Sequence, residues 1–172
     1  MDRMASIELA MRNEKTEMEW YLNESERSNN PLAKKLFVTL ANDEKEHMTR
    51  IKGLHAKLTG EGAWPEDLPL DVAGTCVKDV LDELLGKVGS AEGHDDDDLA
   101  ALNRASNFED KGSKFYAELA GECENPQERK FFSFLSGIER EHYLSIKDSL
   151  FYLEDPEGWT ESKERQGLDG AS

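Results

Sequence analysis

The chain has 172 residues, of which 37% are hydrophobic and 34% are charged, and its formal net charge is −16. This length suits one domain with a substantial core, and this composition is typical of a soluble protein with long exposed helix faces. The negative charge excludes nucleic acids and anionic membrane surfaces as good partners, because both would be repelled.

Helical periodicity appears in four segments, at about residues 5–28, 31–58, 99–123 and 126–153. Pro31 and Pro126 open the second and fourth segments, where a proline in the first turn is tolerated. Between the two pairs lies a glycine-rich connection at about 59–98, within which residues 77–88 resemble a short amphipathic helix. No strand is convincing, so we predict an all-α fold.

The two helical pairs are copies of each other at an offset of 95 residues, without a gap. The offset superposes Glu14 on Glu109, Tyr21 on Tyr116, Glu44 on Glu139 and His47 on His142. We therefore expect a single domain over residues 1–172: one hairpin at about 5–58, a long crossover at about 59–98, and a second hairpin at about 99–154, together forming a four-helix bundle. Residues 155–172 read as a C-terminal tail, which Trp159 is expected to pack against the bundle.

Each helical segment carries a glutamate in the middle of its apolar seam. Glu14 and Glu44 are each fifteen residues from Asn29 at the turn, so both lie about 22 Å from the turn and at the same height. Glu109 and Glu139 repeat this geometry in the second hairpin. The bundle core should therefore hold four carboxylates in one layer.

Two histidines, His47 and His142, follow Glu44 and Glu139 by three residues and so lie on the same helix faces. Four ionised carboxylates cannot be buried alone, because each costs several kcal/mol to desolvate. Two divalent cations would neutralise them. Mixed oxygen and nitrogen ligands suit iron or manganese better than zinc, whose structural sites are closed and tetrahedral.

The motifs "NEKTEMEWY", "NDEKEH", "FEDKGSKFY" and "IEREH" resemble those of the ferritin-like superfamily and, within it, the diiron domain of rubrerythrins. The resemblance covers nearly the whole chain. It implies two iron ions, with manganese or zinc as substitutes. It assigns Glu14 and His47 to one iron, Glu109 and His142 to the other, and a bridging role to Glu44 and Glu139.

The function that the resemblance implies is redox catalysis at the diiron centre, with hydrogen peroxide favoured over dioxygen as the oxidant. We expect the protein to be a homodimer. Residues 155–172 lack the four cysteines of the rubredoxin-like domain found in full-length rubrerythrins, so electrons must come from a separate rubredoxin-like donor. The chain has two cysteines and no C-x-x-C, which favours the cytoplasm. A second interpretation is an iron-oxidising or metal-handling protein without sustained turnover. A third is a structural bundle with a vestigial site.

Several residues near the predicted site have two open interpretations. Rubrerythrins carry an extra glutamate ligand where this chain has Gly112. The residue at the same position in the other copy of the repeat, called its repeat mate, is Glu17. Glu17 is either a seventh carboxylate ligand or an exposed helix acid. Tyr21 and Tyr116 either hydrogen-bond a ligand carboxylate or only pack in the core. Asp43 is a candidate for orienting an imidazole.

The remaining acids and histidines are expected to lie outside the site. Residues 95–98 are acidic and should favour the N-terminus of the third helix through its dipole. Surface positions are expected for Glu46, Glu141, His55 and His94.

Overall fold

The computed structural model describes residues 3–61, 64–65 and 96–169, and these ranges contain helices and no strand. The helices are α1 (Arg3–Arg27), α2 (Pro31–Glu61), α4 (Asp96–Glu122), α5 (Pro126–Glu154) and α6 (Pro156–Asp169). The all-α fold class is confirmed, and the first four helices coincide with the expected segments to within three residues. The expected helix at 77–88, most of the crossover, Cys76 and His94 lie outside the described residues.

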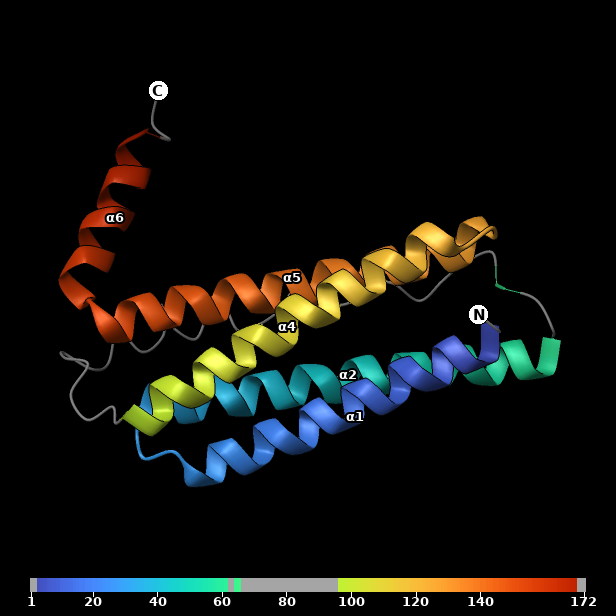
Figure 1. Cartoon of the computed structure of the whole chain (residues 1–172), viewed down its shortest axis with the longest axis horizontal. Coiled ribbons are helices and arrows are strands. Elements are labelled where there is room, and N and C mark those ends of the chain that lie inside the picture. The colour runs from blue at the N-terminus through green and yellow to red at the C-terminus, as the bar shows by residue number, and fades with distance from the viewer. Residues whose placement is uncertain (1–2, 62–63, 66–95, 170–172) are drawn as a thin grey trace.

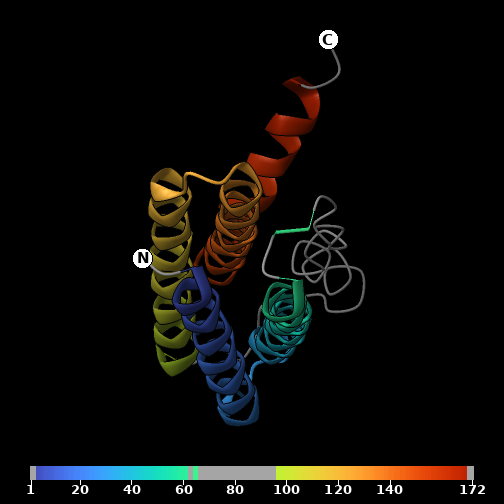
Figure 2. The same ribbon diagram turned by 90° about the vertical axis from the view of Figure 1, so that its right-hand side faces the viewer.

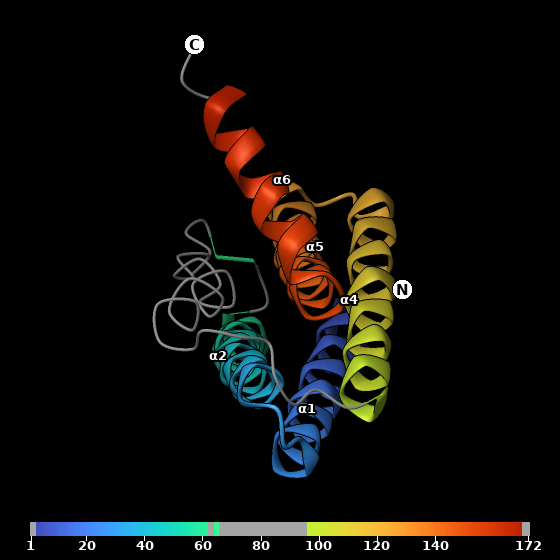
Figure 3. The ribbon, with the colours of Figure 1, turned by 90° about the vertical axis from the view of Figure 1, so that its left-hand side faces the viewer.

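The long helices form two antiparallel hairpins. α1 packs against α2, and α4 packs against α5 (Figure 1). Views along the helices show all four around a common centre, as in a helical bundle (Figures 2 and 3). None of the helices in the described ranges is long and apolar enough to cross a membrane.

Both hairpins start their second helix with the same cap. The Asn30 side-chain oxygen accepts hydrogen bonds from the backbone amides two and three residues later, at 2.9 and 3.0 Å. Asn125 does the same in the second hairpin, at 2.8 and 3.1 Å. These bonds satisfy amide groups that the first turn of a helix leaves unpaired. The repeat in the sequence is therefore also a repeat in local structure.

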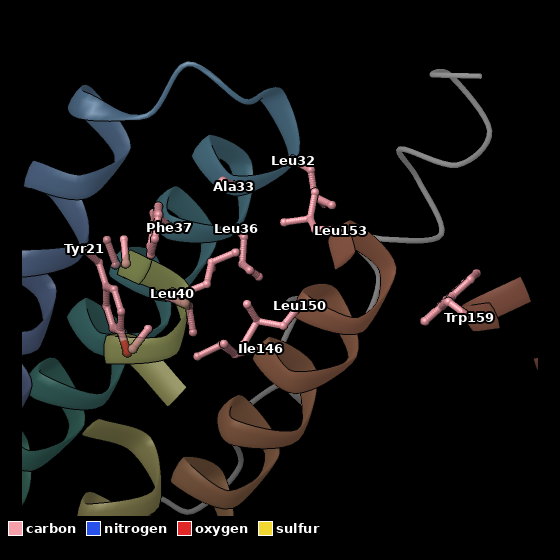
Figure 4. Packing of buried hydrophobic residues seen from close by; sticks show 14 residues of the cluster. Tyr21, Leu32, Ala33, Leu36, Phe37, Leu40, Ile146, Leu150, Leu153 and Trp159 are labelled. Carbon is pink, nitrogen blue, oxygen red and sulfur yellow. The ribbon is translucent and has the colours of Figure 1, made fainter. Parts of the chain in front are cut away.

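The apolar core consists of two clusters, one near each turn. The first-turn cluster comprises Tyr21, Leu32, Ala33, Leu36, Phe37, Leu40, Ala41, Ala101, Leu102, Ala105, Ile146, Leu150, Leu153 and Trp159. The second-turn cluster comprises Ile7, Ala10, Ile51, Leu54, Leu58, Trp64, Tyr116, Leu119, Ala120, Phe131, Phe132 and Leu135. In the first-turn cluster, side chains of α2 and α5 face one another across the bundle (Figure 4).

Each long helix passes from one cluster to the other at a glutamate. In α1, Ile7 and Ala10 belong to the second-turn cluster and Tyr21 to the first-turn cluster, with Glu14 between them. The same change occurs at Glu44, Glu109 and Glu139 in the other three helices. The four carboxylates therefore form a polar layer between two apolar layers.

The segment expected as a tail forms helix α6. Pro156 stands in its first turn, where a proline is tolerated, and the Asp155 carboxylate accepts a hydrogen bond from the Gly158 amide at 2.9 Å. Trp159 is 7% exposed, its indole N–H donates to Asp148 at 3.0 Å, and its ring lies edge-on to Tyr152. The expected packing of Trp159 against the bundle is confirmed, although the proline–aspartate pair that ends α5 also begins a new helix.

Candidate metal centre

All six residues expected as metal ligands lie in the polar layer and are excluded from solvent. Their exposed fractions are 0% for Glu14, Glu44, Glu109 and His142, 1% for Glu139 and 2% for His47. Burial of six ionisable side chains in one place is costly unless charges are compensated. The layer therefore needs protons, cations or both to be stable.

The first group of the layer consists of Glu14, Glu44 and His47, whose nearest ligand atoms all lie within 4.8 Å of one another. The Nδ1 atom of His47 lies 3.2 Å from Oε2 of Glu14 and 3.0 Å from Oε2 of Glu44. One helix of the hairpin supplies the first carboxylate, and the other supplies the second carboxylate and the imidazole. Such a group can hold one metal ion.

The second group consists of Glu44, Glu109, Glu139 and His142, again with ligand atoms within 4.8 Å of one another. The Nδ1 atom of His142 lies 3.2 Å from Oε1 of Glu44 and 3.4 Å from Oε2 of Glu109. Glu139 belongs to this group only, so the bridging role that the resemblance assigns to Glu139 stays a prediction.

Glu44 is common to both groups. Its Oε2 atom faces His47 and its Oε1 atom faces His142, at 3.0 and 3.2 Å. The two imidazole rings stack with centroids 5.5 Å apart and an angle of 23°. One carboxylate between two imidazoles is the arrangement expected of a residue that contributes to two adjacent ions.

The donor atoms of the two groups are better suited to binding a cation than to hydrogen-bonding one another. Among the described residues, buried side-chain atoms without a hydrogen-bond partner include Oε1 of Glu44, Oε2 of Glu109, Oε2 of Glu139, Nε2 of His47 and both ring nitrogens of His142. Buried polar atoms in proteins are nearly always paired. Electron-pair donors that converge without satisfying one another indicate a site for a positive ion, so buried Glu and His groups here could hold metal.

The pKa values of the first group show how the metal-free layer compensates its charge. Burial raises the pKa of Glu14 to about 7, and the neighbouring Glu44 carboxylate adds to the shift. Burial alone would raise the pKa of Glu44, but the two imidazoles outweigh it and hold this pKa below its usual range. Burial lowers the pKa of His47, yet Glu14 and Glu44 together raise it to about 10.

The second group shows the same competition. Burial, followed by the Glu109 charge, raises the pKa of Glu139 well above its usual range. Burial would lower the pKa of His142, but Glu109 and Asp43 outweigh it and raise this pKa strongly. Without metal, imidazolium groups and protonated carboxyls therefore neutralise the layer. Metal ions need deprotonated ligands, so their binding must release these protons.

The two buried tyrosines bond to the glutamates of the opposite hairpin. The Tyr116 hydroxyl donates to Oε1 of Glu14 at 2.8 Å, and the Tyr21 hydroxyl donates to Oε1 of Glu109. Of the two interpretations that the sequence left open, hydrogen bonding to a carboxylate is the observed one. Each bond fixes one carboxylate oxygen and ties α1 to α4.

Asp43 lies behind one imidazole only. Its Oδ2 atom is 3.5 Å from Nε2 of His142, on the side of the ring away from the carboxylates. The repeat mate of Asp43 is Ile138, which is apolar and cannot play the same part toward His47. The candidate role of Asp43 in orienting an imidazole is therefore supported for His142, and the two halves of the site differ here.

Glu17 lies beside the ligand groups but is not part of them. Its side chain is half-buried, and its pKa is raised by burial first and then by the charges of Glu44 and Glu109. The expectation of an exposed helix acid is therefore too simple, and a role as seventh ligand stays a prediction. Gly112, its repeat mate, lies on α4 next to Glu139.

The acids and histidines that were expected to lie outside the site do so wherever the structure describes them. Glu46 and Glu141 are exposed. His55 is half-buried and lies outside both donor groups, with its Nε2 atom 3.7 Å from Oε1 of Glu8. Asp98, expected only to favour a helix N-terminus, is buried and pairs with Arg27 at 3.4 Å. This ion pair joins α1 to α4, which the sequence did not indicate.

The metal-free protein should lose stability as pH rises from about 4.5 to 10. Glu14 and His47 have folded pKa values of about 7 and 10, above their ordinary values of 4.5 and 6.5, so the folded state binds these protons more tightly than the unfolded state. Their contribution is complete below those ordinary values and is lost as pH rises through the folded values. For Glu14 the loss is on the order of 3 kcal/mol. Urea unfolding with a chelator at pH 5 and pH 8 measures it.

Glu14→Gln is the matched variant, because a neutral amide keeps the shape of the side chain but cannot titrate. Surface acids affect wild type and variant alike, so the difference between the two pH slopes isolates Glu14. The variant should lose less stability between pH 5 and pH 8 than wild type. Equal slopes would show that Glu14 titrates normally and is not part of a coupled buried layer.

Asp43→Ala should weaken binding of one metal ion by about tenfold, because a carboxylate behind a ligand imidazole fixes its tautomer and orientation. Asp43→Asn, whose carbonyl oxygen can still accept from the imidazole, should be affected less. Competition between the protein and a chelator for Co²⁺ measures both affinities. The exposed Glu46→Ala on the same helix is the control, and an equal loss in it would contradict a specific role for Asp43.

Comparisons of the chain with protein-family models, curated proteins and solved structures gave no match. The metal centre is therefore supported by its own residues: two groups of buried donors, each with an imidazole, that share the Glu44 carboxylate.

Proposed function

We propose that the protein is a diiron oxidoreductase that reduces hydrogen peroxide at the carboxylate–histidine layer. The observation that carries this proposal is the position of Glu44 between the two donor groups, with one oxygen toward each imidazole. Such a carboxylate suits two adjacent ions of the same charge. Four carboxylates and two divalent ions together have no net charge, which removes the cost of burying the acids.

The residues that would hold the ions come from all four long helices. Glu14, His47 and Glu44 would hold one ion, and Glu109, His142 and Glu139, again with Glu44, would hold the other. Carboxylate and imidazole donors without thiolates suit iron or manganese. Two bound ferrous ions supply two electrons and Lewis acidity in one place.

The protein's own contribution is to hold the donors and exclude water. Tyr21 and Tyr116 each fix one oxygen of a ligand glutamate, and Asp43 holds His142 from behind. The two apolar clusters close the layer on both sides. A buried polar layer whose donors are held by hydrogen bonds can stabilise charge that develops at one position during a reaction.

Peroxide is favoured as the oxidant by the motifs that resemble the rubrerythrin diiron domain. Its reduction breaks the O–O bond, consumes two electrons and two protons, and yields two water molecules. The sequence contains two cysteines, Cys76 and Cys123, which are too few for a four-cysteine iron centre in this chain. We propose that electrons for repeated reduction come from a rubredoxin-like carrier.

A second candidate function is iron oxidation or iron handling without sustained turnover. A diiron centre that receives no electrons after its first reaction would act in this way. The net charge of −16 favours it, since an acidic surface attracts cations such as Fe²⁺. The two functions use the same site and differ in whether electrons are returned.

The first test is the metal content. Protein loaded anaerobically with Fe²⁺ should contain about two irons per chain by elemental analysis, because the donors form two groups. Glu44→Gln should lose most of the bound iron, since the amide carries no charge to share. Glu46→Ala, an exposed residue two positions along, should bind iron as wild type does. Wild-type protein with one iron or none would exclude a dinuclear centre.

The second test separates the two candidate functions. Ferrous protein mixed with peroxide should react once and stop, and a rubredoxin-like donor with its NADH-dependent reductase should restore repeated peroxide reduction. NADH consumption measured with and without the chain gives the turnover. A single reaction that no donor extends would favour iron oxidation or handling instead. Turnover by NADH and the chain alone would show that a separate carrier is unnecessary.

A further inference from the structure

A pocket lies between α1 and α4, on the side of the bundle where the two hairpins meet. Its volume is about 190 Å³, and it is lined by Asn13 and Glu17 from α1 and by Phe108, Lys111, Gly112 and Phe115 from α4. None of these side chains belongs to the two donor groups. The proposed metal chemistry therefore leaves this pocket without a role.

The floor of the pocket adjoins the buried carboxylates. A Cβ atom added at Gly112 would lie 3.4 Å from Cγ and 3.5 Å from Oε2 of Glu139. These are ordinary van der Waals distances, so Gly112, which lines the pocket, lies next to a donor of the second group. That Oε2 atom is buried and has no hydrogen-bond partner among the described residues.

The pocket also touches the layer from the α1 side. Glu17 lines it, follows Glu14 by one helical turn and is half-buried. The repeat pairs Glu17 with Gly112, so the pocket lies at a position where the two copies of the hairpin differ in side-chain size. A carboxylate on one wall faces a glycine on the other, and the missing side chain leaves the space open.

The size and charge of the pocket limit what can occupy it. Organic substrates usually need pockets of about 300 Å³ or more, whereas one water occupies about 30 Å³ of liquid. The pocket can therefore take a molecule of a few atoms together with some water. Glu17 and Lys111 bring one negative and one positive side chain to the lining, so the pocket has no excess charge of its own to select an ion, and Asn13, Glu17 and Lys111 offer hydrogen-bonding groups to a neutral polar molecule.

We propose that this pocket is the access and docking site through which a small, uncharged ligand of the peroxide class reaches the metal centre, and that Gly112 keeps it open. The inference rests on the proposed function, because it assigns a ligand subsite to that centre. It makes Gly112 a specificity-determining residue. A side chain there would occupy space beside the Glu139 carboxylate and block even a ligand of a few atoms.

The experiment uses nitric oxide as the probe, since it is small, uncharged and binds ferrous ions without needing an electron donor. Iron content is measured first in wild type, in Gly112→Leu and in Gly137→Leu. Gly137 is an exposed glycine of α5 with nothing within 4 Å of an added Cβ, so it controls for replacing a helical glycine by leucine. Stopped-flow absorbance then gives the association rate of nitric oxide with each ferrous protein.

Gly112→Leu should bind nitric oxide at least about tenfold more slowly than wild type, because leucine fills the pocket, and its iron content shows whether the added side chain disturbs Glu139. Gly137→Leu should bind at the wild-type rate. Asn13→Leu, which fills the pocket from the α1 wall, should also slow the binding of nitric oxide. If Gly112→Leu loses iron, the binding rate of Asn13→Leu tests the access pocket instead. Wild-type rates in iron-loaded pocket variants would overturn the access pocket while leaving the metal centre intact. Absence of iron from wild type would instead overturn the proposed function.

Discussion

Four carboxylates buried at one height of an apolar core are the constraint on which the rest of the structure depends. Each ionised carboxylate costs several kcal/mol when it is removed from water. In the metal-free protein the imidazolium of His47 and the raised pKa of Glu14 and Glu139 offset this cost with protons. The six side chains of the layer are at most 2% exposed and lie between two apolar clusters, so the charge balance must be achieved largely inside the layer.

This constraint explains why the fold is a duplicated hairpin. Equal arms of fifteen residues from each turn bring the two glutamates of a hairpin to one height, and docking of two such hairpins brings all four together. The crosswise bonds from Tyr21 to Glu109 and from Tyr116 to Glu14 then fix the height of one hairpin against the other. A shift by one helical turn would break both bonds.

The helices, the repeat and the six donor residues could be predicted from the sequence because they depend on local periodicity. Glu44 and His47 share a face through their spacing, whatever lies opposite. The partners of the tyrosines could not be predicted in the same way. Tyr21 lies about 10 Å along the helix from Glu14, too far for a bond, and its actual partner depends on how two hairpins dock. The 95-residue repeat could have signalled the reciprocal arrangement.

Helix α6 was missed for a different reason. Asp155 and Pro156 are residues that end one helix and can equally begin another, and local sequence does not decide between the two. The decision comes from tertiary packing, because Trp159 finds a hydrogen-bond partner in Asp148 and an aromatic neighbour in Tyr152. The pairing of Asp43 with His142 also depends on contact between hairpins, since α2 and α5 belong to different copies.

The departures from the repeat give the two halves of the proposed metal centre different properties. Asp43 stands behind His142, whereas apolar Ile138 takes the corresponding position in the other copy. Gly112 opens a pocket beside Glu139, whereas Glu17 fills the corresponding position. Both departures concern the second donor group: its imidazole has a carboxylate behind it, and its Glu139 carboxylate lies next to the glycine that lines the pocket. If ions bind as proposed, the imidazole with the additional support and the carboxylate beside the pocket would serve the same ion, so the departures from the repeat would act together on one half of the centre.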